Sequence, residues 1–166
     1  MTSCRVLLGI AALAGIVSAC VGDEAASEVV LTSGDGCGDA SFWATTAADD
    51  VAVTVHVDAR DRSLLEPTTL EYVLPDPAVE VEILEGDGLS RNFCTDAIDS
   101  ASEPQRRRLA TAGEVTVTLD PPPGGPDVFG CGSVSGKLEL HGIVAEDGTT
   151  FAPVTVTSDA IGCYAG

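Results

Sequence analysis

Residues 50–58 read DVAVTVHVD, and this stretch decides the fold class. Valines occupy positions 51, 53, 55 and 57, while Ala52, Thr54 and His56 stand between them. Successive side chains of an extended chain point to opposite faces, so a period of two puts all four valines on one face. The stretch therefore predicts a β-strand with one buried face and one mainly polar face.

The same alternation recurs along the chain. Four further runs show it: Val79, Val81 and Ile83 with Glu80, Glu82 and Leu84; Val115, Val117 and Leu119 with Thr116 and Thr118; Leu138 and Leu140 with Glu139 and His141; Val154 and Val156 with Thr155 and Thr157. Residues 40–46 and 69–74 add two runs, and residues 29–31 can form a first strand. The pattern predicts about eight half-buried antiparallel strands.

Turn-forming residues separate these runs, as in the PPPGGP sequence at 121–126. Only residues 96–112 lack clear alternation, and part of that stretch could form a single helical turn. Short strands at this spacing, in a chain of this length, indicate one core. We predict a single all-β domain over residues 33–166, an antiparallel β-sandwich of the Ig-like, Greek-key type.

The first twenty residues have the three parts of an export signal. Arg5 precedes an uncharged apolar run at 6–17, and Ser18 and Ala19 supply small residues before Cys20. Val17-Ser18-Ala19-Cys20 resembles the lipobox of bacterial lipoproteins. The resemblance implies that residues 1–19 are a signal peptide, that Cys20 is acylated after export, and that residues 20–32 are the acylated cysteine and a short tether. The alternative is an ordinary secretory signal, with Cys20 free to form a disulfide.

The cysteine count agrees with lipidation. Six cysteines occur, and four remain when Cys4 leaves with the leader and Cys20 carries lipid. An even number in an exported chain suggests two disulfides, and four cysteines allow three pairings. Residues 146–149 (EDGT) form a predicted hairpin turn, and Cys131 and Cys163 each lie 16 residues from Asp147. This symmetry favours Cys131–Cys163 and, by elimination, Cys37–Cys94.

The charge limits the possible partners. The chain carries 26 Asp and Glu against eight Lys and Arg, a net charge of −18, which becomes −19 once residues 1–19 are removed. Such a field repels nucleic acid and anionic lipid headgroups. We expect no nucleic-acid partner. Contact with the membrane should occur through the N-terminal lipid, and the other partner should be an envelope protein or glycan.

Acidic turns could hold calcium, which takes six to eight oxygen ligands. The candidates are Asp35, Asp39, Asp49, Asp50 and Asp87, with Glu85 beside the last of them. None of them belongs to a complete calcium-loop motif, and acid next to glycine is also typical of any exposed turn. His56 and His141, the only histidines, fall on the polar parity of their strands, so we expect both to face solvent.

Two further features are candidate binding residues. Trp43, the only tryptophan, could stack on a sugar, but in a sandwich it would more typically lie in the core against the Cys37–Cys94 disulfide. The triplet Arg106, Arg107 and Arg108 could be an anionic-partner docking patch, or a solvated loop that balances nearby acids.

No motif for a catalytic nucleophile occurs: the serines of the GSVSG sequence at 132–136 have the wrong spacing for a nucleophile elbow. The sequence thus predicts a non-catalytic, cofactor-free protein of binding or structural type, lipid-anchored to the bacterial cell membrane or outer membrane. The alternatives are a calcium-dependent adhesion or ligand-binding module and a small exported hydrolase.

Overall fold

A computed structural model describes residues 27–38, 40–57, 67–121 and 134–162. It is all-β, with eight strands and two short 3-10 turns. The elements are β1 (Ser33–Cys37), β2 (Ser41–Thr45), β3 (Val51–Val57), β4 (Thr68–Val73), β5 (Val79–Glu85), η1 (Leu89–Asn92), η2 (Ser100–Ser102), β6 (Arg106–Asp120), β7 (Val134–Ala145) and β8 (Val154–Ile161). The predicted all-β, antiparallel class is confirmed.

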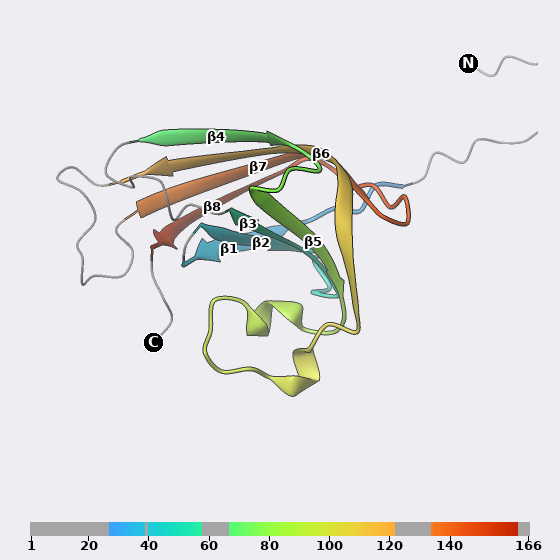
Figure 1. Cartoon of the computed structure of the whole chain (residues 1–166). Helices are drawn as coiled ribbons and strands as arrows, with labels where there is room; N and C mark the ends of the chain where they lie inside the picture. The colour runs from blue at the N-terminus through green and yellow to red at the C-terminus, as the bar shows by residue number, and fades with distance from the viewer. Residues whose placement is uncertain (1–26, 39, 58–66, 122–133, 163–166) are drawn as a thin grey trace, which may run out of the picture.

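All eight strands belong to one antiparallel sheet. Its order is β1-β2-β3-β5-β6-β7-β8, and β4 pairs with β6. The 15-residue β6 makes this possible, because residues 106–109 pair with β5 and residues 114–119 pair with β4, while β7 lies along its other edge. Between the two stretches the register shifts twice, and Gly113 has a positive φ of 131°. Figure 1 shows β6 bending there from one layer of strands to the other.

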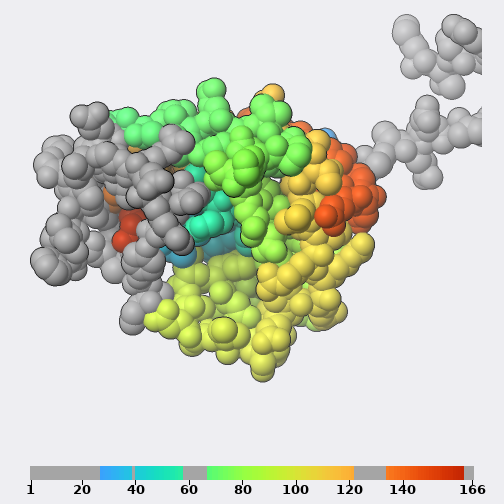
Figure 2. Space-filling model, viewed as in Figure 1, coloured from blue at the N-terminus to red at the C-terminus, as the bar shows by residue number. Residues whose placement is uncertain are grey.

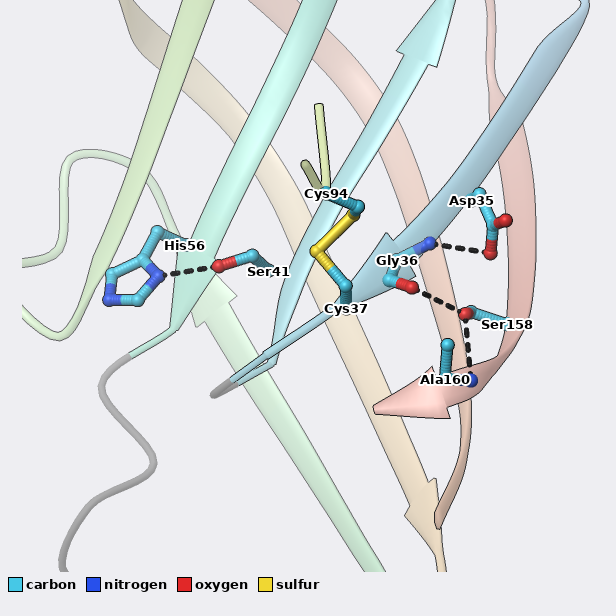
Figure 3. Close-up of a disulfide and its surroundings, with 8 residues drawn as sticks. All are labelled: Asp35, Gly36, Cys37, Ser41, His56, Cys94, Ser158 and Ala160. Atoms are coloured by element: carbon cyan, nitrogen blue, oxygen red, sulfur yellow. Dashed lines mark hydrogen bonds between the residues drawn. A yellow bond between two sulfur atoms is a disulfide. The ribbon is translucent and has the colours of Figure 1, made fainter. Parts of the chain in front are cut away.

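The two ends of the sheet, β1 and β8, meet each other. The Ser158 hydroxyl donates to the Gly36 carbonyl oxygen at 2.7 Å (Figure 3). The Gly162 N–H donates to the Gly38 carbonyl oxygen, also at 2.7 Å. Gly34 permits this approach, because a Cβ on it would lie only 2.8 Å from a methyl carbon of Val156. The sheet is therefore nearly closed into a barrel. The expected Ig-like sandwich of two separate sheets is not confirmed.

The core lies inside this nearly closed sheet and is built mainly from the alternating apolar residues. Val53, Val55 and Val57 of β3 are at most 1% exposed, and the inward residues of the other strands are buried with them. Phe42 and Phe151 are the aromatic side chains that are almost fully buried in this cluster. Burial of β-branched and aliphatic side chains is the main stabilising contribution here.

The folded part begins earlier than the predicted boundary at residue 33. Val29 donates its N–H to the Thr150 carbonyl oxygen and accepts from the Ala152 N–H, both at 2.9 Å. Leu31 is 6% exposed and belongs to the core. Residues 29–31 thus contact the barrel as an extended segment rather than forming a full strand or a tether. None of the helical turns in the described ranges is long and apolar enough to cross a membrane.

Candidate binding site under the 86–105 segment

Residues 86–105 connect β5 to β6 and cover the outer face of β2, β3 and β5; we call them the cover segment. Figure 1 shows this segment, with η1 and η2, on the side of these strands that faces away from β4, β7 and β8. The helical turn expected within residues 96–112 is η2, and β6 begins directly after the cover segment at Arg106. Residues 96–112, which lack clear alternation in the sequence, therefore comprise the second half of the cover segment and the start of β6.

The first anchor of the cover segment is Leu89, which is 1% exposed. It packs on Ala52 and Leu84, two residues that point out of the barrel and form a small apolar cluster with it. Asp49 adds polar contacts, because its carboxylate accepts from the Ser90 N–H at 3.1 Å and from the Ser90 hydroxyl at 2.6 Å. Leu84 occupies an outward position of β5, where the alternation would place a polar residue. Its apolar side chain is explained by Leu89, which covers it.

The second anchor is the disulfide between Cys37, at the end of β1, and Cys94 (Figure 3). The two Cα atoms are 5.8 Å apart, and the cysteines are 57 positions apart in the sequence. This is the pairing that the sequence indicated by elimination. The other predicted pair, Cys131–Cys163, and the lipidation candidate Cys20 lie outside the described residues.

Trp43 lies beneath the second anchor. Phe42 and Ala44 point into the barrel, so Trp43, between them on β2, points outward and is half-buried. Its ring centroid is 5.3 Å from that of Phe93, with the ring planes tilted by 33°. Trp43 therefore lies beside the disulfide, as expected, but under the cover segment rather than in the main core. Among the described residues its buried Nε1–H has no hydrogen-bond partner.

The space around these rings is a hollow of about 260 Å³, which we call the Trp43 hollow. Its polar and aromatic lining residues include Ser41, Trp43, Thr54, His56, Asn92 and Phe93. A second hollow of about 500 Å³, lined in part by charged residues, shares Thr54, Asn92 and Phe93 with it. Ile98, which is 74% exposed, lies at this second hollow together with the ion pair between Arg107 and Glu82. We call these two neighbouring hollows, which share three lining residues, the groove between the sheet and the cover segment.

His56 and Ser41 form a hydrogen-bonded pair at the rim of the Trp43 hollow. The Ser41 hydroxyl lies 2.9 Å from His56 Nδ1, and the two residues face each other across β2 and β3 (Figure 3). The sequence analysis did not identify Ser41. The signal was the hairpin turn near residues 46–50, which places positions 41 and 56 opposite each other. His141 is on β7, which is not a neighbour of β3, so the two histidines are not brought together.

Asn92 organises the middle of the cover segment. Its side-chain amide donates to the Asp99 carbonyl oxygen at 3.0 Å, and its Oδ1 accepts from the Asp99 N–H at 2.7 Å. The Asp99 carboxylate accepts from the Ala101 N–H, and this bond, with smaller contributions from Ser102 and Arg91, lowers the pKa of Asp99. The second half of the segment is thus ordered by its own hydrogen bonds.

The arginine triplet starts a strand and is not a solvated loop. Arg108 points inward, is 7% exposed and forms ion pairs with Glu85 and Asp147. Arg107 points outward and lies 3.3 Å from Glu82, while Arg106 lies 3.7 Å from Glu85. The expectation that the triplet balances nearby acids is confirmed by these ion pairs.

Asp147, which pairs with Arg108, lies in the hairpin turn between β7 and β8. The predicted turn is present, because the Gly148 N–H donates to the Ala145 carbonyl oxygen at 2.9 Å. Hydrogen bonds from the Thr149 hydroxyl and N–H, followed by the charges of Arg108 and Arg106, lower the pKa of Asp147.

The calcium candidates are dispersed. Asp35 accepts from the N–H of its neighbour Gly36, Asp49 holds Ser90, and Asp50 accepts from the Thr46 hydroxyl. Asp87 is exposed in the turn after β5, and Asp39 lies outside the described residues. In the ranges that the structure describes, no three His, Cys, Asp or Glu side chains are grouped so that they could hold a metal ion.

Comparisons with known proteins add no relative: no family model, no curated protein and no solved structure matches this chain. The groove is therefore interpreted from its own chemistry. The Trp43 hollow is mainly apolar and aromatic with a few uncharged polar residues, whereas the second hollow is lined by both apolar and charged residues.

Proposed function

We propose that this chain is a lipid-anchored binding protein of the bacterial cell envelope, and that its ligand occupies the groove between the sheet and the cover segment. The observation that carries the proposal is the groove itself, in which half-buried Trp43 of β2 contacts Phe93 of the cover segment, a segment held by a disulfide. Surface aromatic side chains that are neither fully buried nor fully exposed are typical of binding sites.

The extracytoplasmic location rests on two features. Disulfides persist in oxidising compartments and are rare in the cytosol, so the Cys37–Cys94 bond favours export. The lipobox-like sequence ending at Cys20 supplies the leader and the anchor. The described fold begins at Val29, which leaves about eight residues between the anchor cysteine and the barrel.

The anchor is tested by intact mass spectrometry of the membrane fraction, with and without reduction, for the wild type and Cys20→Ala. We expect an acylated chain that begins at Cys20 and gains two protons for each of two disulfides on reduction. Cys20→Ala should be unacylated. A soluble wild-type chain that is unmodified and begins elsewhere would contradict the lipid anchor.

A second candidate function, an exported hydrolase, is favoured by one observation, the hydrogen bond between Ser41 and His56. A serine hydroxyl within hydrogen-bond distance of an imidazole nitrogen is the first part of a nucleophile–base pair. Labelling with a fluorophosphonate tests it, because the probe reacts covalently with an activated serine. Labelling of the wild type that is lost in Ser41→Ala would support this candidate; an unlabelled wild type would remove it.

A further inference from the structure

We propose that the Trp43 hollow binds a neutral sugar ring, so that the ligand of this protein is an uncharged glycan. The inference rests on the proposed binding function and specifies the class of ligand. Three properties of the hollow carry it: the charge of its lining, the arrangement of its aromatic rings, and its size and continuation.

The first property is the absence of charge. The chain has 26 Asp and Glu residues, yet the polar side chains of this hollow are Ser41, Thr54, His56 and Asn92, none of which is a carboxylate, Lys or Arg. A site for a cationic ligand would be expected to use the abundant acids, and an anionic ligand is repelled by the field of the whole molecule. Hydroxyl, amide and imidazole groups match the donors and acceptors of neutral sugar hydroxyls.

The second property is the pair of aromatic rings. Trp43 projects from the outer face of β2 and packs against Phe93 of the cover segment, with a ring tilt of 33°, and both rings line the hollow. The C–H groups on one face of a pyranose ring are apolar and pack on aromatic faces, whereas the rim of the sugar stays polar. The hydrogen-bonding groups of Thr54 and Asn92 line the same hollow as these rings.

The third property is size. About 260 Å³ suits a single sugar ring rather than a larger cofactor. The adjoining hollow of about 500 Å³ shares Thr54, Asn92 and Phe93, so a second ring can continue along the groove. There the charges of Arg107 and Glu82 are paired with each other at 3.3 Å, and Glu103 adds a carboxylate to the lining, so the uncharged part of the site is the Trp43 hollow itself.

Trp43 provides the readout, because it is the only tryptophan of the chain. The purified protein is titrated with millimolar maltose, cellobiose and N,N′-diacetylchitobiose, and with glucose 6-phosphate as an anionic probe. We expect a saturable change in tryptophan emission with at least one neutral disaccharide and none with the phosphorylated sugar. Ligand-observed saturation-transfer NMR measures the same binding without relying on fluorescence.

Variants localise the binding. Thr54→Val keeps the tryptophan and removes one hydroxyl, so the affinity should fall roughly threefold to tenfold, the effect of one neutral hydrogen bond. The matched control is Thr155→Val on the outer face of β8, which should bind like the wild type. The variant Trp43→Ala should show no binding when it is measured by saturation-transfer NMR. Circular dichroism checks that this variant folds.

Three outcomes would overturn the inference: no saturable response to the neutral disaccharides, undiminished binding by folded Trp43→Ala, or preferential binding of glucose 6-phosphate. The acylation of Cys20 is measured separately by mass. Failure of glycan binding with an intact lipid anchor would therefore reject the ligand class and leave the envelope location standing.

Discussion

The two outer faces of the barrel come from the same alternating pattern but differ in what they present. On β6, β7 and β8 the outward residues are mainly polar, including Thr116, Thr118 and Thr155, and Lys137 pairs with Glu139 at 2.8 Å. On β2, β3 and β5 the outward residues include Trp43, Ala52 and Leu84, and the cover segment lies over them. Figure 2 shows this segment as a layer below the strands. On β2, β3 and β5 the apolar residues at outward positions therefore mark the place where a second layer covers the sheet.

The largest effect is expected when the disulfide that holds the cover segment is removed. In Cys37→Ser/Cys94→Ser the free energy of unfolding should fall by about 4 kcal/mol, the chain-entropy value for a bond that links residues 57 positions apart. Urea denaturation measures it. A midpoint equal to that of the wild type would mean that the bond does not stabilise the fold.

Leu89→Ala tests the other anchor. It removes a fully buried side chain from its contacts with Ala52 and Leu84 and should cost about 3 kcal/mol, as a buried leucine truncation does. The matched control in the same segment is Ile98→Ala, which removes a side chain that is 74% exposed and should change the stability by less than about 0.5 kcal/mol. Equal effects on urea denaturation would contradict the proposed packing.

The adjacent arginines provide an inside–outside comparison on one strand. Arg108→Ala leaves Glu85 and Asp147 without their buried partner, and should cost about 2 kcal/mol, less than a fully buried pair because both carboxylates remain partly exposed. Arg107→Ala breaks an exposed pair with Glu82 and should cost at most about 1 kcal/mol. A larger loss in Arg107→Ala would reverse the assignment of the two faces.

The pH dependence of stability tests Asp147, whose pKa is lowered chiefly by hydrogen bonds from Thr149. A carboxyl with a lower pKa in the folded state contributes stability above its ordinary value of 3.8, and this contribution is lost as the pH falls through the folded-state pKa. Thr149→Val removes the hydroxyl bond, so the loss of stability below about pH 4 should be smaller than in the wild type. Urea midpoints measured across this acidic range would coincide if the bond had no effect.

Most strands could be predicted because burial on one face imposes a period of two, as in residues 50–58. The closure into a barrel could not, because it depends on where β6 bends and on the contact between Gly36 and Ser158, which are 122 residues apart. Such long-range contacts leave little signal in a single sequence.

The candidate site was predicted only in part for two local reasons. Phe42 and Trp43 are adjacent, so only one of them can point into the barrel, and the pattern of a five-residue strand did not decide which. The start of β6 at the arginine triplet could not be predicted, because Arg108 points inward only when Glu85 and Asp147 pair with its charge. Ser41 became visible only through its register with His56.

The most direct test of the two-layer account is acrylamide quenching of Trp43 in the wild type and in Cys37→Ser/Cys94→Ser, with far-UV circular dichroism to show that the barrel is retained. The account predicts that loss of the disulfide loosens Phe93 from the indole, so quenching increases and the emission shifts to the red. Identical quenching in two folded proteins would show that the disulfide does not hold the cover segment over Trp43 and would contradict the account.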